Sequence, residues 1–122
     1  MSARRLELFQ WFGLLAAPCA WAIHLVVGLY LAEAHCEATH WDSGWAPTQI
    51  ALTSAAALVA LLAEAAALSV YRDLRRTGVD AAGPRGRQHF FAVGGLVGNI
   101  LFFVAILLTG ITVVATQSCR EA

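Results

Sequence analysis

Three long apolar runs constrain this sequence more than any other feature. They cover about residues 11–32, 48–71 and 90–116. Each run reaches the roughly 20 residues that an α-helix needs to cross about 30 Å of hydrocarbon. None of them alternates apolar and polar residues with a period of two, which argues against the strands of a barrel. The runs therefore predict an all-α integral membrane protein, with three transmembrane helices in an antiparallel bundle.

The composition supports this assignment. Of the 122 residues 59% are hydrophobic and 13% are charged, whereas a soluble domain carries roughly 25% charged residues. We therefore predict that residues 1–122 form a single transmembrane domain. The formal net charge is zero, so nothing points to nucleic acid as a partner. The first run exceeds the 7–15 residues of a cleaved signal peptide, and we expect it to remain as a helix.

The arginines predict the orientation of the helices. All eight basic residues are Arg, and seven of them lie in the N-terminal segment or in the predicted loop 72–89. Only Arg120 lies on the other side, with the predicted loop 33–47 and the C-terminal tail. Cytoplasmic segments carry an excess of positive charge. We therefore expect a cytoplasmic N-terminus and a C-terminus on the periplasmic or exterior side.

Two cysteines follow apolar runs on the predicted outer side. Cys36 lies just beyond the first run and Cys119 just beyond the third. Disulfides persist in oxidising compartments, so a Cys36–Cys119 bridge would tie the outer ends of these two helices together. A pair of thiolate metal ligands and two unpaired thiols are the alternatives. Cys19 lies within the first run, where we expect a small buried side chain.

Small residues predict where the helices pack. The third run contains Gly94 and Gly98 in a GxxxG spacing, the first contains Gly28 and the second Ala60. Small side chains let helix backbones approach closely in lipid. The same faces would suit docking onto helices of a larger partner. The second run is rich in Ala and is expected to be shielded by its neighbours, and Pro18 is expected to bend the first helix slightly.

Polar residues inside the apolar runs are candidates for function. They are His24, Glu64 and Asn99 in the first, second and third runs. A Glu64–Asn99 hydrogen bond that holds two helices together is the simplest hypothesis, and a proton relay, a quinone contact or a contact with a partner subunit are alternatives. A bis-His haem needs a second His at the depth of His24, and the other runs supply none. Single-His pigment ligation stays open, beside a hydrogen-bonded or partner-facing His24.

The predicted outer loop holds the remaining metal candidates. His35 and His40 lie near three carboxylates and Cys36, but their spacing matches no metal signature, and we predict no metal site. The chain also lacks HExxH, CxxC and any pairing of a nucleophile with a base. We therefore expect a protein that is not an enzyme and has no cofactor of its own.

Several segments resemble one group of proteins. They are the segment WFGLLAAPCAWAIHLVVGLY at 11–30, the outer Cys36, the stretch 85–91 and the Cys119-Arg120 ending. Together they look like a group of small bacterial three-helix membrane proteins that are often encoded beside caa3-type cytochrome c oxidase genes. The likeness spans most of the chain, and the group offers no catalytic residues to carry over.

The resemblance implies a non-catalytic accessory or assembly subunit of the bacterial inner membrane. Its partner would be a larger complex of the respiratory chain, above all a haem–copper terminal oxidase, where the chain could contact lipid and the haem or quinone of that complex. Two other hypotheses remain. One is a small membrane protein that binds haem, a metal or a quinone, and the other is an oligomeric transporter or channel.

Overall fold

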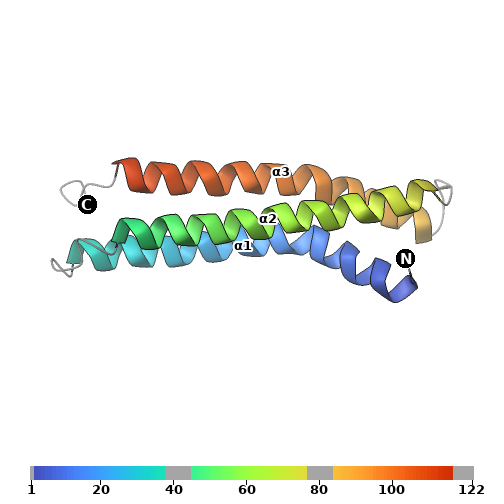
Figure 1. The fold of residues 1–122 in the computed structure, drawn as a ribbon, viewed down its shortest axis with the longest axis horizontal. Coiled ribbons are helices and arrows are strands. Elements are labelled where there is room, and N and C mark those ends of the chain that lie inside the picture. Colours follow the sequence, from blue (N-terminus) through green and yellow to red (C-terminus); the bar gives the residue numbers. More distant parts are fainter. Residues whose placement is uncertain (1, 38–44, 77–83, 117–122) are drawn as a thin grey trace.

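The chain forms three long helices that pack side by side (Figure 1). A computed structural model describes residues 2–37, 45–76 and 84–116, and all of these except Ser2 are helical. The helices are α1 (Ala3–Glu37), α2 (Trp45–Arg76) and α3 (Pro84–Thr116), and each contacts the other two. The predicted all-α three-helix membrane bundle is therefore confirmed. The start of α1, the end of α2 and the start of α3 lie at one end of the bundle, which we call the arginine-rich end.

The helices extend well beyond the apolar runs. The predicted loop bounds 33–47 and 72–89 were wrong, because α1 continues to Glu37, α2 runs from Trp45 to Arg76 and α3 starts at Pro84. Both Pro47 and Pro84 lie in the first turn of a helix, where the missing N–H would have no intrahelical partner. Ser2 caps α1, since its Oγ accepts a hydrogen bond from the N–H of Arg5 at 3.3 Å.

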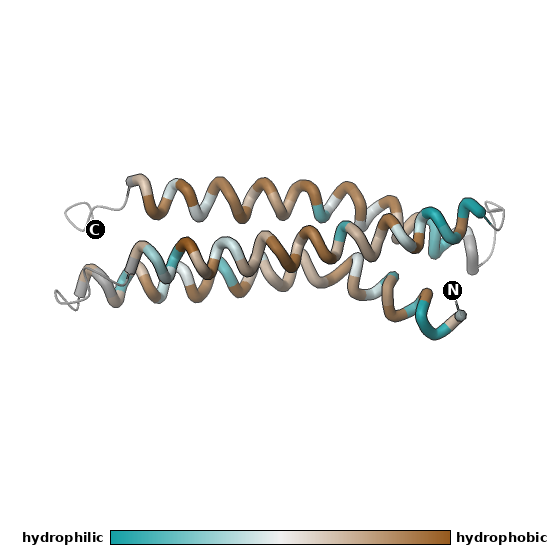
Figure 2. The backbone as a smooth tube through the Cα atoms, in the orientation of Figure 1, coloured by the Kyte–Doolittle hydropathy of each residue, from teal (hydrophilic) through white to brown (hydrophobic). Residues whose placement is uncertain are grey.

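The outside of the bundle suits a membrane. Each helix contains a stretch long and apolar enough to cross a bilayer. Large apolar side chains are exposed on all three helices, and hydrophilic residues concentrate at the arginine-rich end (Figure 2). Exposed apolar surface on this scale would promote aggregation in water. It is the expected exterior of a protein in lipid. The chain is thus a membrane protein by length and composition.

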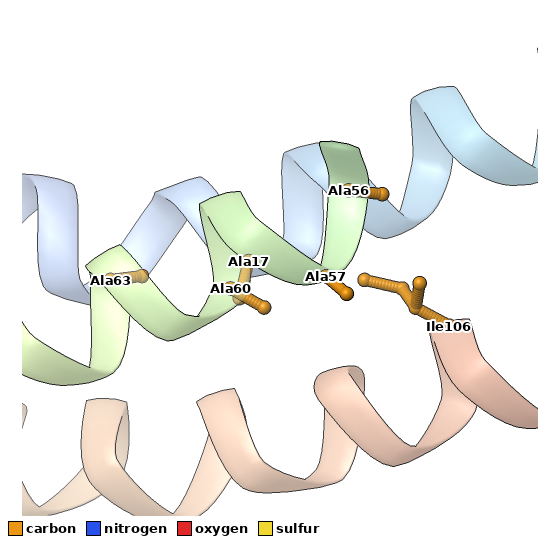
Figure 3. Close-up of a cluster of buried hydrophobic side chains, with 6 residues drawn as sticks. All are labelled: Ala17, Ala56, Ala57, Ala60, Ala63 and Ile106. Atoms are coloured by element: carbon orange, nitrogen blue, oxygen red, sulfur yellow. The ribbon is translucent and has the colours of Figure 1, made fainter. Parts of the chain in front are cut away.

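The centre of the bundle is built from alanine. Figure 3 shows the buried cluster of Ala17 from α1, Ile106 from α3 and four residues of α2, namely Ala56, Ala57, Ala60 and Ala63. In its most apolar stretch α2 has 33% of its residues buried, against 17% in α1 and 22% in α3. The expected shielding of the Ala-rich helix is therefore confirmed. Side chains this small allow the helix backbones to lie close together.

Three glycines occur where the helices approach most closely, and we call them the contact glycines. A Cβ on Gly13 would lie 2.9 Å from the backbone nitrogen of Ala67, and one on Gly95 would lie 2.9 Å from the carbonyl oxygen of Gly13. A Cβ on Gly110 would overlap the side chain of Thr53. These sites connect all three helices, and only glycine fits there without a shift of the neighbouring atoms.

Gly94 and Gly98 do not pack inside the bundle, which leaves docking onto a helix of a partner as the expected role of this pair. No atom of the described chain would lie within 4 Å of a Cβ on either of them. The inward stripe of α3 instead recurs at three-, four- and seven-residue steps, and its members are Ala92, Gly95, Asn99, Ile106 and Gly110. Gly28 and Ala60 do lie inside, because Gly28 faces the Gln49 amide and Ala60 is 1% exposed.

The first part of α1 runs in a different direction from the rest of that helix (Figure 1). Pro18 lies inside this helix, and it cannot donate the backbone hydrogen bond to the carbonyl four residues earlier. Sharp changes of helix direction usually occur at such positions. At the arginine-rich end a cleft lies between the first part of α1 and the start of α3.

Candidate functional sites: two polar clusters inside the bundle

An inner polar cluster joins all three helices near the arginine-rich end. The Nδ2 of Asn99 on α3 donates a hydrogen bond to the carbonyl oxygen of Gly13 on α1 at 2.8 Å. The carboxyl group of Glu64 on α2 lies beside Asn99 and interacts with its side chain. Asn99 is 2% exposed. Because polar groups are costly to leave unpaired in an apolar environment, these contacts favour one relative position of the three helices.

One atom of the inner cluster has no partner. The Oε2 of Glu64 is buried and makes no hydrogen bond within the described part of the chain. Buried polar atoms are satisfied in the great majority of cases, so an exception calls for an explanation. A group could reach this oxygen only if the helices around it moved apart.

An outer polar cluster joins α1 and α2 further along the bundle. The Nε2 of His24 lies 2.9 Å from the Oγ1 of Thr53, and the Nε2 of Gln49 donates a hydrogen bond to the carbonyl oxygen of Gly28 at 2.9 Å. His24 and Gln49 are 3% and 1% exposed. Sequence reasoning missed the role of Gln49, although a Gln at the outer end of an apolar run is itself a signal for an interhelical hydrogen bond.

An apolar layer separates the two clusters. The buried residues between them are small or aliphatic on every helix: Ala17 on α1, Ile106 on α3, and Ala56, Ala57, Ala60 and Ala63 on α2. No polar side chain lies in this cluster of buried residues. Within the described helices, the two clusters therefore do not form a continuous chain of hydrogen bonds along which a proton could cross the bundle.

His24 is poorly placed to hold a haem or a metal ion. Its Nε2 contacts Thr53, and its Nδ1 is buried without a partner among the described residues. A ligand would have to displace Thr53 or open the bundle to reach a nitrogen. Beside His24, a shallow groove of about 370 Å³ runs between α1 and α2. Cys19 lines this groove as an exposed free thiol, which corrects the expectation that it is buried.

The remaining candidate ligands belong largely to segments outside the described residues. His40 and Cys119 lie there entirely, and so does the side chain of His35. Cys36 lies in the last turns of α1, and its pairing with Cys119 stays a prediction. Within residues 2–37, 45–76 and 84–116, no three His, Cys, Asp or Glu side chains lie close enough to hold a metal ion.

Comparisons with known proteins give no relative. The chain matches no protein-family model, no curated protein and no solved structure.

Proposed function

We propose that this protein is a non-catalytic accessory subunit whose helices pack against those of a larger membrane complex. The observation that carries the proposal is the unoccupied space beside Gly94 and Gly98. Glycine in a helix interior costs up to about 1 kcal/mol relative to alanine. Within this chain, the contact glycines occur where another helix lies close. No described helix of this chain covers the GxxxG pair. The pair is therefore suited to close approach by a helix of another protein.

Large apolar side chains flank this pair. Phe90, Val97 and Leu101 lie at helical spacing on the same side of α3 and are 71%, 57% and 64% exposed. We call these residues, together with Gly94 and Gly98, the open glycine face. A partner helix could approach the backbone at the glycines while the larger side chains pack around it.

The identity of the partner is proposed from the resemblance described above. It points to a haem–copper terminal oxidase in a bacterial inner membrane. The distribution of arginines supports a cytoplasmic N-terminus and a periplasmic C-terminus. In that orientation the inner polar cluster lies toward the cytoplasm.

A pull-down from native membranes in mild detergent tests this proposal. Mass spectrometry and an optical spectrum of the same eluate should reveal oxidase subunits and haem a bands. A different membrane complex in the eluate would overturn the oxidase as partner and leave the accessory role. A protein that purifies alone would overturn the accessory role, and a haem spectrum from that lone protein would support the binding of haem by His24 instead.

Substitutions on the open glycine face show whether that surface carries the interaction. The double variant Gly94→Ile and Gly98→Ile fills the space beside α3 and should abolish co-purification. Ala22→Ile is the matched control, since Ala22 is an exposed small residue of α1. Both variants should keep the helical circular dichroism of the wild type. Co-purification that survives the double variant would exclude the open glycine face as the docking surface.

A further inference from the structure

A cleft between α1 and α3 at the arginine-rich end has no role in the proposed docking. Its volume is about 390 Å³, within the range of small-molecule sites. The cleft is lined by Glu7, Gln10 and Trp11 of α1 and by Arg87, Gln88 and Phe91 of α3. The cleft lies between the first part of α1, which bends (Figure 1), and the start of α3.

Gln10 is the residue that points to a ligand. Only 9% of its surface is exposed, it lines the cleft, and its amide makes no hydrogen bond with any residue in the described ranges. The amide is not among the fully enclosed polar atoms of the bundle, so it is reachable from the cleft. Gln10 therefore presents a hydrogen-bonding amide to an occupant of the cleft.

Two unpaired charges line the same cleft. Arg87 and Glu7 are both exposed, and neither forms an ion pair with a described residue. Arg87 lies near the start of α3, whose first turn contains no acidic residue. The free N–H groups and the dipole of a helix N-terminus favour an anion. The α3 side of the cleft is thus suited to a negative group and the Glu7 side to a hydrogen-bond donor.

The aromatic residues place the cleft at the surface of the membrane. The rings of Trp11 and Phe91 lie 6.4 Å apart between their centroids, and Trp11 is 46% exposed. Tryptophan is enriched where hydrocarbon meets the headgroups. Arg87 and Gln88 lie only a few residues beyond the first residue of α3. An occupant of the cleft would therefore be at the depth of lipid headgroups.

We infer that this cleft binds the headgroup of a phospholipid that carries both a phosphodiester and a hydrogen-bond donor. The phosphodiester lies against Arg87, Gln10 and Gln88. The donor, which is the ammonium of phosphatidylethanolamine or a hydroxyl of phosphatidylglycerol, lies against Glu7. Phosphatidylcholine has the phosphodiester but no such donor. The inference does not depend on the proposed docking, because the cleft and the open glycine face share no residue.

Native mass spectrometry of the delipidated full chain tests the inference. Phosphatidylethanolamine, phosphatidylglycerol, phosphatidylcholine and inorganic phosphate are each added at equal concentration. The first two lipids should remain bound, while phosphatidylcholine is retained severalfold less and phosphate alone is not retained. Equal retention of all three lipids would refute a specific headgroup site. Retention of phosphate alone would identify a site for a free anion instead.

Three variants test which side chain contacts which part of the lipid headgroup. Arg87→Gln should reduce bound phosphatidylethanolamine roughly tenfold, and Gln10→Leu should reduce it about fivefold. Glu7→Gln should remove the preference over phosphatidylcholine. Arg72→Gln is the matched control, since Arg72 is an exposed arginine of α2 at the same end and does not line the cleft.

The variants also distinguish binding from folding. Each is compared with the wild type by helical circular dichroism and size-exclusion elution before lipid is added. If one variant fails to fold, the lipid retention of the other two is used to test the site. Wild-type retention in correctly folded Arg87→Gln and Gln10→Leu would overturn the proposed site.

Discussion

The contact between Gly95 and Gly13 gives a quantitative test of the packing. A Cβ at position 95 would lie 2.9 Å from the carbonyl oxygen of Gly13, where ordinary contacts begin at 3.4 Å, so α1 and α3 would have to separate by about 0.5 Å. The obstructing atom belongs to the backbone and cannot rotate away. The same shift would stretch the 2.8 Å hydrogen bond from Asn99 to that carbonyl oxygen. We therefore expect Gly95→Ala to destabilise the bundle.

Its neighbour provides the matched control. Gly94 lies on the same helix, and a Cβ there meets nothing within 4 Å. The gain in helix propensity from Gly to Ala, up to about 1 kcal/mol, applies to both positions and cancels in the comparison. Overpacking typically costs about 1–3 kcal/mol. Gly95→Ala should therefore be less stable than Gly94→Ala by about that amount.

Reversible unfolding measures this difference. The purified variants are titrated with SDS in mild-detergent micelles, and helicity is followed by far-UV circular dichroism. The expected result is an earlier transition for Gly95→Ala than for Gly94→Ala. If Gly95→Ala is equally stable or more stable, the helices are not in the close contact described, and the assignment of inner and outer faces of α3 is wrong.

Further predictions concern the inner polar cluster, the outer cysteines and the orientation. Asn99→Leu removes the hydrogen bond to the carbonyl oxygen of Gly13 and should cost about 0.6–2 kcal/mol in the same SDS titration; an unchanged transition would show that this bond does not stabilise the bundle. Non-reducing peptide mapping should recover Cys36 linked to Cys119, and alkylation of both without a reductant would refute the bridge. A reporter fused after Ala122 should be active in the periplasm, whereas cytoplasmic activity would reverse the orientation.

Part of the candidate sites could be predicted from the sequence. Glu64 and Asn99 stand out because polar residues are rare within apolar runs, and counting residues from the helix ends places them at the same depth. Gln10 was missed because it lies near the end of the first helix, where a polar residue attracts no notice. Its burial depends on how α3 packs beside it.

The glycines show where sequence reasoning fails in a membrane protein. The GxxxG spacing of Gly94 and Gly98 predicted close packing, yet Gly95 makes the contact inside the chain. In a soluble helix, the apolar stripe marks the buried face. In lipid both the inner and the outer faces are apolar, so hydropathy does not distinguish them.

The three helices and their place in a membrane can be predicted from the apolar runs alone. Apolar runs of this length can satisfy their backbone hydrogen bonds in lipid only as helices or as a closed barrel, and the absence of period-two alternation favours helices. The packing of the helices shows in addition which face of each helix is inside, that Gly13 and Gly95 meet, and that a cleft lies between the first part of α1 and the start of α3. These features depend on the rotation of each helix about its axis, which the packing of all three helices sets together.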